Sequence, residues 1–360
     1  MIEQLSGRQE LRQTKALYEE VFPEDSKEFV DYYYHDKVVD SLAYVKKVNG
    51  TIEAMIHMNP FWCYWNTDIV TREKIYYLVA VATRTEARHR GYMNGLLHRV
   101  VRESYEQQIP FLALMPANPQ IYEPYDFTYI TRRASYSPCD HIICQENCIR
   151  SNELHELVVL SNSILSERYT CYVERDVAYY ERLLLELESQ QGSLYWLVKE
   201  GERIGYCFYE SAEGSVQEFG LLPEFSMEET VLEEFIIEEQ VGKPHMMGRI
   251  IALDKMGDWC CLREEVIEES IAVVLFIQDG MIKENHGLFR WVIHREGSRF
   301  EPLQEVDQDQ MIWTITIAQL TSILFGYETI NQCCIGVLEE YKLLQRKIKI
   351  KMDIFFQEVV

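Results

Sequence analysis

Blocks of helical and strand periodicity follow one another along the first third of the chain. Apolar residues at helical spacing predict two amphipathic helices, over residues 1–22 and 27–34. The dipeptide Asn49-Gly50 separates two β-rich runs, 41–48 and 51–59. Because Asn-Gly favours the tightest hairpin turns, we expect these runs to form an antiparallel pair.

A buried strand and a long amphipathic helix come next, with a short loop between them. Residues 76–82 form an unbroken run of aromatic, β-branched and small apolar residues, which is typical of a strand covered on both faces. Beyond the loop, Leu97 and Val101 share one stripe of a predicted helix that ends near residue 107. A short apolar strand is expected at residues 111–115.

The next block repeats this order of elements. We expect helices at 154–165 and 177–187, a hairpin of 194–198 with 204–209, a strand at 216–222 and a helix at 227–241. The block resembles the first one but has no Arg-x-x-Gly loop after its third strand.

The last block begins after Pro244, with residues 246–251 expected to open a third unit. Strands are predicted at 271–277, 288–294 and 311–317, and helices at 317–324 and 332–344. The predicted fold class is therefore α/β followed by α+β, with three units at 1–135, 136–243 and 244–360.

Composition and charge argue against some classes of function and partner. The net charge of −23 argues against a nucleic-acid partner. An acidic surface attracts cationic small molecules, although acidity also simply keeps a large protein soluble. No apolar run is long enough to span a membrane and no signal peptide is recognised at the N-terminus, so a cytoplasmic protein is expected.

Cysteines do not predict a metal site. Ten cysteines without a secretion signal are expected to be reduced thiols. The densest Cys/His cluster contains Cys139, His141, Cys144 and Cys148, but it has neither a Cys-x-x-Cys pair nor a second ligand pair. We therefore expect buried thiols and no metal.

The loop between the buried strand and the helix carries candidate chemistry. Arg88, Arg90 and Gly91 precede a predicted helix N-terminus, where free N–H groups and the helix dipole favour anions. A glycine lets a ligand approach the backbone closely, so a pyrophosphate site is one interpretation. The alternative is an ordinary helix start with solvated arginines.

This stretch resembles the acetyl-coenzyme A motif of the GNAT N-acetyltransferases, Gln/Arg-x-x-Gly-x-Gly/Ala. Arg88 and Gly91 match that motif, and Met93 stands where a small residue is usual. A second resemblance lies in the GNAT segment Tyr-x-x-x-Gly-Phe, which Tyr122 and Phe127 match while Asp126 replaces the glycine. That replacement makes the local turn uncertain, because Asp adopts a left-handed conformation less easily than Gly. A phenol at this place would protonate the departing thiolate, whereas a buried structural tyrosine is the alternative.

Over essentially its whole length the chain resembles the Eis (enhanced intracellular survival) acetyltransferases, which have two GNAT folds followed by a sterol-carrier-protein-like domain. The apolar end of the chain, which closes on Val360, fits a docked C-terminus. The resemblance implies that the Val360 carboxylate is the base and Tyr122 the acid. It also implies a hexameric homo-oligomer, and acetyl-coenzyme A held by Val79, Val81, Arg88, Arg90, Gly91, Tyr92, Met93 and Asn118.

The acceptor is expected to be a cationic amine such as an aminoglycoside, a polyamine or a peptide lysine. The resemblance places an acidic amine contact at Asp25, and the aromatic helix beside it, with Phe29 and Tyr33, either walls this pocket or belongs to the core. The alternative function is a lipid or small-ligand carrier with an inactive acetyltransferase fold. That carrier would need a tunnel between the strand near Leu275 and the helix near Leu324.

Overall fold

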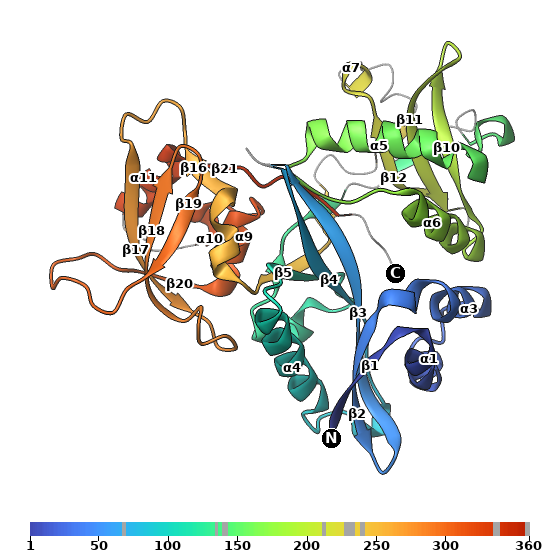
Figure 1. Ribbon diagram of the computed structural model, residues 1–360, viewed down its shortest axis with the longest axis horizontal. Helices are drawn as coiled ribbons and strands as arrows, with labels where there is room; N and C mark the ends of the chain where they lie inside the picture. Colours follow the sequence, from blue (N-terminus) through green and yellow to red (C-terminus); the bar gives the residue numbers. More distant parts are fainter. Residues whose placement is uncertain are drawn as a thin grey trace.

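The computed structural model describes residues 1–66, 70–133, 136–138, 143–210, 214–226, 235–237, 242–333 and 339–356. The largest sheet takes strands from all three blocks of the sequence (Figure 1). Its main path is β1-β2-β3-β4-β5-β15-β6, with β9 attached to β3 and β22 attached to β9. The strands are β1 Ile2–Ser6, β2 Leu42–Val48, β3 Thr51–Asn66, β4 Val70–Thr83, β5 Phe111–Leu114, β6 Thr128–Tyr129, β9 Cys171–Val173, β15 Met247–Ile250 and β22 Ile354–Phe355.

Helices cover both faces of this sheet. Alternate residues of the strands point to opposite faces, so that Tyr77 belongs to the core cluster that includes residues of the first helices, and Tyr76 belongs to the cluster that includes the apolar face of the helix at Tyr92–Glu106. The hairpin predicted at Asn49-Gly50 is confirmed, since both residues have positive φ (51° and 82°). The mixed α/β class is also confirmed. The helices are α1 Gly7–Leu11, α2 Lys15–Val21, α3 Lys27–His35 and α4 Tyr92–Glu106.

Strand β15 corrects one expectation. Residues 246–251 were expected to open the third unit, but β15 lies antiparallel between β5 and β6, and Met247 faces Leu114 and Tyr129. This expectation was wrong because pairing with strands so far away in the chain leaves no local signal.

The second block forms a separate five-stranded sheet in the order β10-β11-β12-β8-β13. The hairpin and both long helices lie where the sequence predicts them. The helix predicted at 227–241 is wrong at Phe235–Ile237, which form strand β13, and its remaining residues lie outside the described part of the chain. The elements are β8 Tyr136–Pro138, α5 Leu154–Arg168, α6 Val177–Ser189, β10 Gly192–Lys199, β11 Glu202–Glu210, β12 Ser215–Leu221, α7 Pro223–Ser226 and β13 Phe235–Ile237.

The third block forms a four-stranded sheet in the order β19-β18-β17-β20, with helices beside it. Within the range 332–344 that was predicted as one long helix, the described residues are helical in α10 and α11, and residues 334–338 lie outside the described part. The elements are β16 Cys260–Leu262, β17 Ser270–Gln278, β18 Gly287–His294, β19 Ser298–Pro302, β20 Trp313–Thr316, α9 Ile317–Leu324, α10 Ile330–Cys333, α11 Glu339–Lys347 and β21 Ile348–Ile350. Strand β16 pairs with β21, and a further pair joins β7 Arg132–Arg133 to β14 Lys243–Pro244.

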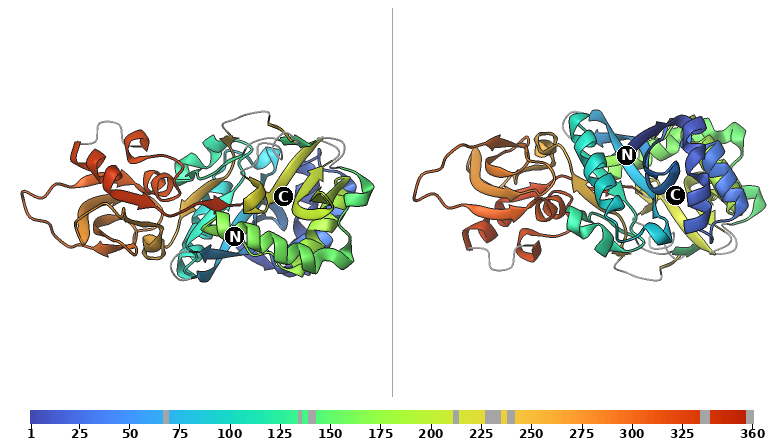
Figure 2. Two further views of the ribbon diagram at one scale, coloured as in Figure 1. Left: turned by 90° about the horizontal axis from the view of Figure 1, so that it is seen from above. Right: turned by 90° about the horizontal axis from the view of Figure 1, so that it is seen from below.

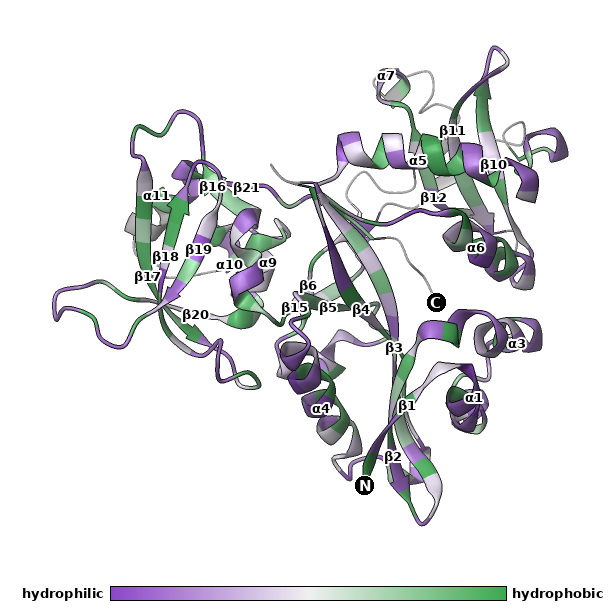
Figure 3. Ribbon diagram, viewed as in Figure 1, coloured by the Kyte–Doolittle hydropathy of each residue, from purple (hydrophilic) through white to green (hydrophobic). Residues whose placement is uncertain are grey.

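The molecule is elongated, with the four-stranded sheet at one end (Figure 2). Apolar residues follow strands such as β17, whereas helix α3 shows many polar residues in the same view (Figure 3). One continuous core joins the blocks, and Trp259 lies in it against Trp65 and Phe325, with ring centroids 4.7 Å away in both cases. None of the helices in the described ranges is long and apolar enough to cross a bilayer.

Candidate active site

Strand β4 contains a bulge where it leaves its regular pairing with β3. His57 pairs with Val79 and Met55 with Ala82, so Ala80 and Val81 together face the single residue Ile56. Ala80 has φ 48°, a left-handed conformation that costs an alanine about 1–2 kcal/mol. Strain of this kind persists where the surrounding structure enforces it, and it is common at functional sites.

A cleft opens beyond the bulge because β4 extends further than its parallel neighbour, β5. Strands β4 and β5 are paired at Tyr76–Leu112 and Tyr77–Ala113. Strand β5 then ends at Leu114, whereas β4 continues through the bulge to Thr83. The last residues of β4 therefore form one wall of the cleft.

The loop after β4 places the N-terminus of α4 at the same cleft. Gly91 caps the helix with φ 74°, and His89 is also left-handed with φ 62°. No atom lies within 4 Å of the place that a Cβ on Gly91 would occupy, so the backbone there is open to a ligand. The N–H groups of the first helical turn lack intrahelical acceptors, and the helix dipole makes this end positive. Exposed Arg88 adds a full positive charge.

The cleft has a volume of about 530 Å³ and unites most of the predicted cofactor residues with the predicted acid. Those predicted residues are Val81, Arg88, Gly91, Tyr92, Met93 and Tyr122. The other lining residues belong to no sequence motif, so the sequence did not predict them. They are Val21, Ala82, Thr83, Ala87, His89, Asn94, Ile121 and Tyr125.

Tyr122 lies between two short 3₁₀ helices, Pro119–Ile121 and Glu123–Tyr125. Only 7% of its surface is exposed, and its ring packs edge-on against Phe127 with centroids 6.1 Å apart. Burial raises the pKa of Tyr122 to about 12. Its hydroxyl is therefore protonated at neutral pH and able to donate a proton into the cleft.

The turn between Tyr122 and Phe127, which the replacement of glycine by Asp126 made uncertain from the sequence, is present in the structure. Asp126 has φ 62° and ψ 22°, the left-handed conformation. Burial raises the pKa of its carboxyl group. The exchange of Gly for Asp thus leaves the turn around Tyr122 intact.

Three predicted cofactor residues lie beside the cleft rather than in its lining. Val79 is buried next to the bulge, and Arg90 is exposed beside Gly91. Asn118 is exposed and caps the 3₁₀ helix before Tyr122, its Oδ1 accepting the Gln120 N–H at 3.0 Å.

The predicted amine-binding residues lie around helix α3. The Asp25 carboxylate accepts a hydrogen bond from the Tyr18 hydroxyl at 2.7 Å, and burial raises its pKa. Phe29 and Tyr33 are both buried, and Tyr33 belongs to the core beneath the sheet. The structure therefore favours the core interpretation for these two rings.

A neutral polar network runs through this core. The Tyr33 hydroxyl lies 2.9 Å from His57 Nδ1, and Thr14 Oγ1 lies 2.9 Å from His57 Nε2. His57 is fully buried, which lowers its pKa to about 3 and keeps the ring neutral. His57 therefore has a structural role in this core.

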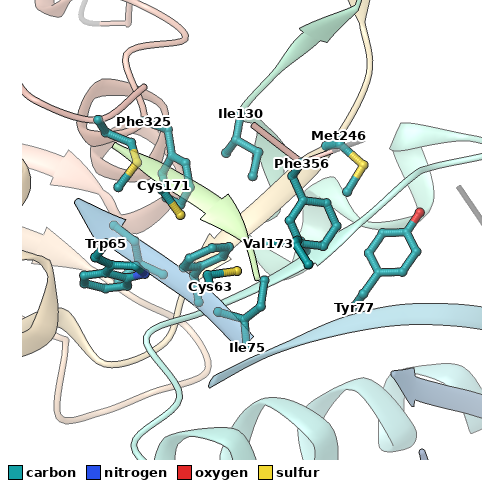
Figure 4. Packing of buried hydrophobic residues seen from close by; sticks show 14 of the residues in the cluster. Cys63, Trp65, Ile75, Tyr77, Ile130, Cys171, Val173, Met246, Phe325 and Phe356 are labelled. Atoms are coloured by element: carbon teal, nitrogen blue, oxygen red, sulfur yellow. The ribbon is translucent and has the colours of Figure 1, made fainter. Parts of the chain in front are cut away.

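The end of the described chain lies close to β4. Phe356 is buried, and its ring centroid lies 5.5 Å from that of Phe61. The ring of Tyr77 lies beside it, with the two centroids 5.6 Å apart (Figure 4). Val360, the predicted base, lies outside the described residues, as do Cys139 and His141.

The carrier alternative requires a tunnel near Leu275 and Leu324, and both of these residues are completely buried and pack in the core. A partly apolar cleft of about 290 Å³ lies between β17 and α11, with Val273 and Leu344 in its lining.

Comparison with known proteins assigns the first block. Residues 4–130 match the sequence profile described as an acetyltransferase (GNAT) domain. No protein in the curated collection of sequences matches the chain.

Solved structures with the same fold extend over the whole chain. A probable N-acyltransferase from Enterococcus faecalis has 15% identity and a TM-score of 0.74, over 99% of each chain. A GCN5-related N-acetyltransferase from Anabaena variabilis has 15% identity and a TM-score of 0.71, over 98% of this chain and 97% of the other. Eis1 from Mycobacterium abscessus has 12% identity and a TM-score of 0.64, over 98% and 94%. The cleft thus lies in a region matching the acetyltransferase (GNAT) domain, and the protein is an enzyme with an acetyltransferase fold.

Proposed function

We propose that this enzyme transfers the acetyl group of acetyl-coenzyme A to a primary amine of a cationic small molecule or peptide. One observation carries the proposal. A single cleft contains an open helix N-terminus with a left-handed glycine, an arginine and a buried, protonated tyrosine. The first two features fit a pyrophosphate, and the third fits a departing thiolate.

In this proposal the N–H groups of Gly91, Tyr92 and Met93 bind the pyrophosphate, with Arg88 and Arg90 adding charge. The backbone of β4 around Val79 and Val81 orients the pantetheine arm, and its N–H groups stabilise the developing oxyanion. Tyr122 donates its hydroxyl proton to the sulfur that leaves.

The attacking amine must first lose a proton, because primary amines are mostly protonated at pH 7. We propose that the Val360 carboxylate accepts this proton, directly or through water. Supporting this, Phe356 is docked on Tyr77, and four more residues span up to about 13 Å of extended chain. Asp25 and the net charge of −23 favour a cationic acceptor. The last unit is proposed to be sterol-carrier-protein-like.

The first experiment is isothermal titration of acetyl-coenzyme A into the wild-type protein and an Arg88→Ala/Arg90→Ala variant. We expect micromolar binding by the wild type and at least about tenfold weaker binding by the variant, which loses two charges at the anion site. An Arg299→Ala/Arg295→Ala variant in the third unit is the matched control. Absence of binding to the wild type would refute the enzyme assignment of this cleft.

The terminal base is tested by removing Val359 and Val360. We expect no turnover of a panel of amines (spermidine, kanamycin and a lysine peptide), while acetyl-coenzyme A still binds with unchanged affinity. Full activity of the shortened protein would exclude the terminal carboxylate as the base.

A further inference from the structure

The loop between β17 and β18, in the third unit, enters the core beneath the candidate active site. Ile282 of this loop is completely buried in the cluster that also contains Tyr122, Phe127 and the apolar face of α4. The third unit thus packs directly against the segment that carries the proposed acid.

Asp279 fixes the conformation of this loop. Its side chain has no exposed surface, and Oδ1 accepts the backbone N–H groups of Met281 and Ile282, both at 2.8 Å. Its Oδ2 accepts Asn285 Nδ2 at 3.2 Å, and the same amide donates to the Ile251 carbonyl at 2.9 Å. The loop is therefore held both to itself and to the chain that follows β15.

Arg249 of β15 connects Asp279 to the tyrosine turn. The side chain of Arg249 is completely buried, and its Nη2 donates to Asp279 Oδ1 at 2.6 Å. Its Nε donates to the carbonyl of Tyr125 at 2.9 Å. One guanidinium thus reaches from the third unit to the backbone of the turn that follows Tyr122.

Asp126 adds a second connection at the same place. Its Oδ2 lies 3.8 Å from Arg249 Nη2, and the backbone N–H of Gly280 in the β17–β18 loop acts to lower the pKa of its carboxyl group, against the effect of burial. Glycine at this position would permit the same left-handed backbone, but it would bring no charge toward Arg249. Asp126 can therefore connect the turn after Tyr122 to the third unit, which a glycine could not do.

We propose that Asp279, Arg249 and Asp126 are positioning residues for Tyr122, so that the third unit sets the place of the proton donor. The inference rests on the proposed function, because it takes Tyr122 to be the acid. A charge buried in this way is costly unless its partners are all present, and the partners here lie on three separate elements. Together they fix the turn of residues 122–127 relative to β4.

The test compares kcat, KM and the Kd of acetyl-coenzyme A for Arg249→Lys and Asp126→Asn, alone and combined with Tyr122→Phe. Spermidine serves as the acceptor, or whichever amine of the panel the wild type acetylates. Arg249→Lys keeps the charge but loses the Nε contact, so we expect kcat to fall about tenfold, with KM and Kd changed less than about twofold. In the Tyr122→Phe background, Arg249→Lys should lower kcat by less than about twofold, because the hydroxyl that Arg249 helps to position is absent.

Hydrogen exchange provides a readout that needs no acceptor. In the turn, the N–H groups of Tyr125 and Asp126 donate to the carbonyls of Tyr122 and Glu123, at 2.9 and 3.0 Å. We expect Arg249→Lys and Asp279→Asn to speed exchange of these two amides selectively. The control is Glu284→Gln, which breaks the exposed ion pair between the same loop and Arg102 and should change neither exchange nor kcat.

Two results would overturn the inference. One is an equal loss of kcat in both backgrounds by folded variants, which would show that the effect does not act through Tyr122. The other is exchange in the turn that matches the Glu284→Gln control. A wild-type kcat for Tyr122→Phe would instead refute the acid role, and a lack of acetyl-coenzyme A binding would refute the proposed function itself.

Discussion

The first and second blocks of the chain build similar layers but differ where the third strand meets the next helix. Both have helices followed by a hairpin with almost the same turn, at Asn49-Gly50 (φ 51° and 82°) and at Glu200-Gly201 (φ 52° and 85°). In the first block the loop after β4 offers Arg88 and a left-handed Gly91 before a helix of 15 residues.

In the second block the junction after β12 is chemically opposite. Helix α7 begins at Pro223, which has no N–H to offer, and Glu224 supplies a negative charge within its first turn. Strand β12 pairs with antiparallel β8, whereas β4 has the shorter parallel neighbour β5 beside the cleft. A shared arrangement of strands therefore does not make a binding site, and under the proposed function a few residues at one junction distinguish the block that binds an anion.

The largest expected effect that separates the two blocks is the loss of activity in Tyr122→Phe, which removes the proposed acid of the first block. We expect kcat to fall about 100-fold or more, because a phenylalanine cannot protonate the thiolate. The Kd of acetyl-coenzyme A, measured by calorimetry, should stay unchanged. Tyr209→Phe in the second block is the control and should leave kcat at the wild-type value, while a wild-type rate for Tyr122→Phe would make Tyr122 a core residue.

A smaller effect, on the Kd of acetyl-coenzyme A, is expected from replacing the left-handed glycine of the first block, Gly91, and not from replacing that of the second, Gly201. Gly91→Ala disfavours the loop conformation by about 1–2 kcal/mol, so acetyl-coenzyme A should bind about tenfold more weakly. Gly201→Ala has the same backbone strain in the second block. It should lower the Tm similarly and leave the Kd unchanged. Equal effects of both changes on the Kd would show that Gly91 acts only through stability.

The last contrast concerns the polar interiors, which are neutral around His57 in the first block and charged at the buried Arg175–Glu218 pair in the second. The folded-state pKa of His57, about 3, lies below its usual 6.5, so the unfolded chain binds this proton more readily. Its contribution to stability is complete above pH 6.5 and is lost as the pH falls toward 3, by up to about 1.4 kcal/mol per pH unit.

Urea unfolding of the wild type and His57→Gln between pH 7 and pH 4 measures this contribution. The variant should be less stable at pH 7 and should lose less stability on acidification. Parallel curves for the two proteins would contradict the assignment of this acid sensitivity to His57.

The sequence predicted the features that depend on neighbouring residues. The Asn49-Gly50 hairpin, helix α4 and the loop at Gly91 all follow from local composition, and the cleft indeed brings that loop to Tyr122. Site roles that rest on resemblance, such as those of Asp25 and Val360, remain predictions.

Other features could not be predicted because their causes lie far away in the chain. Ala80 gives no signal of its left-handed conformation, since the bulge is imposed by pairing with β3. Arg249 looks like an ordinary charged residue, and only β15 pairing in the first sheet buries it beside Asp279.

The mixed origin of the largest sheet has a consequence for synthesis of the protein. Strands β9, β15 and β22 arrive from the later blocks, and the last of them ends at Phe355. At about 5–20 residues per second, the ribosome needs roughly 20–70 s to reach that residue. During part of that time the edges of β3 and β5 lack their later partners, β9 and β15. Unpaired edges of this kind promote aggregation, so the nascent chain is expected to need chaperones until these later strands have paired.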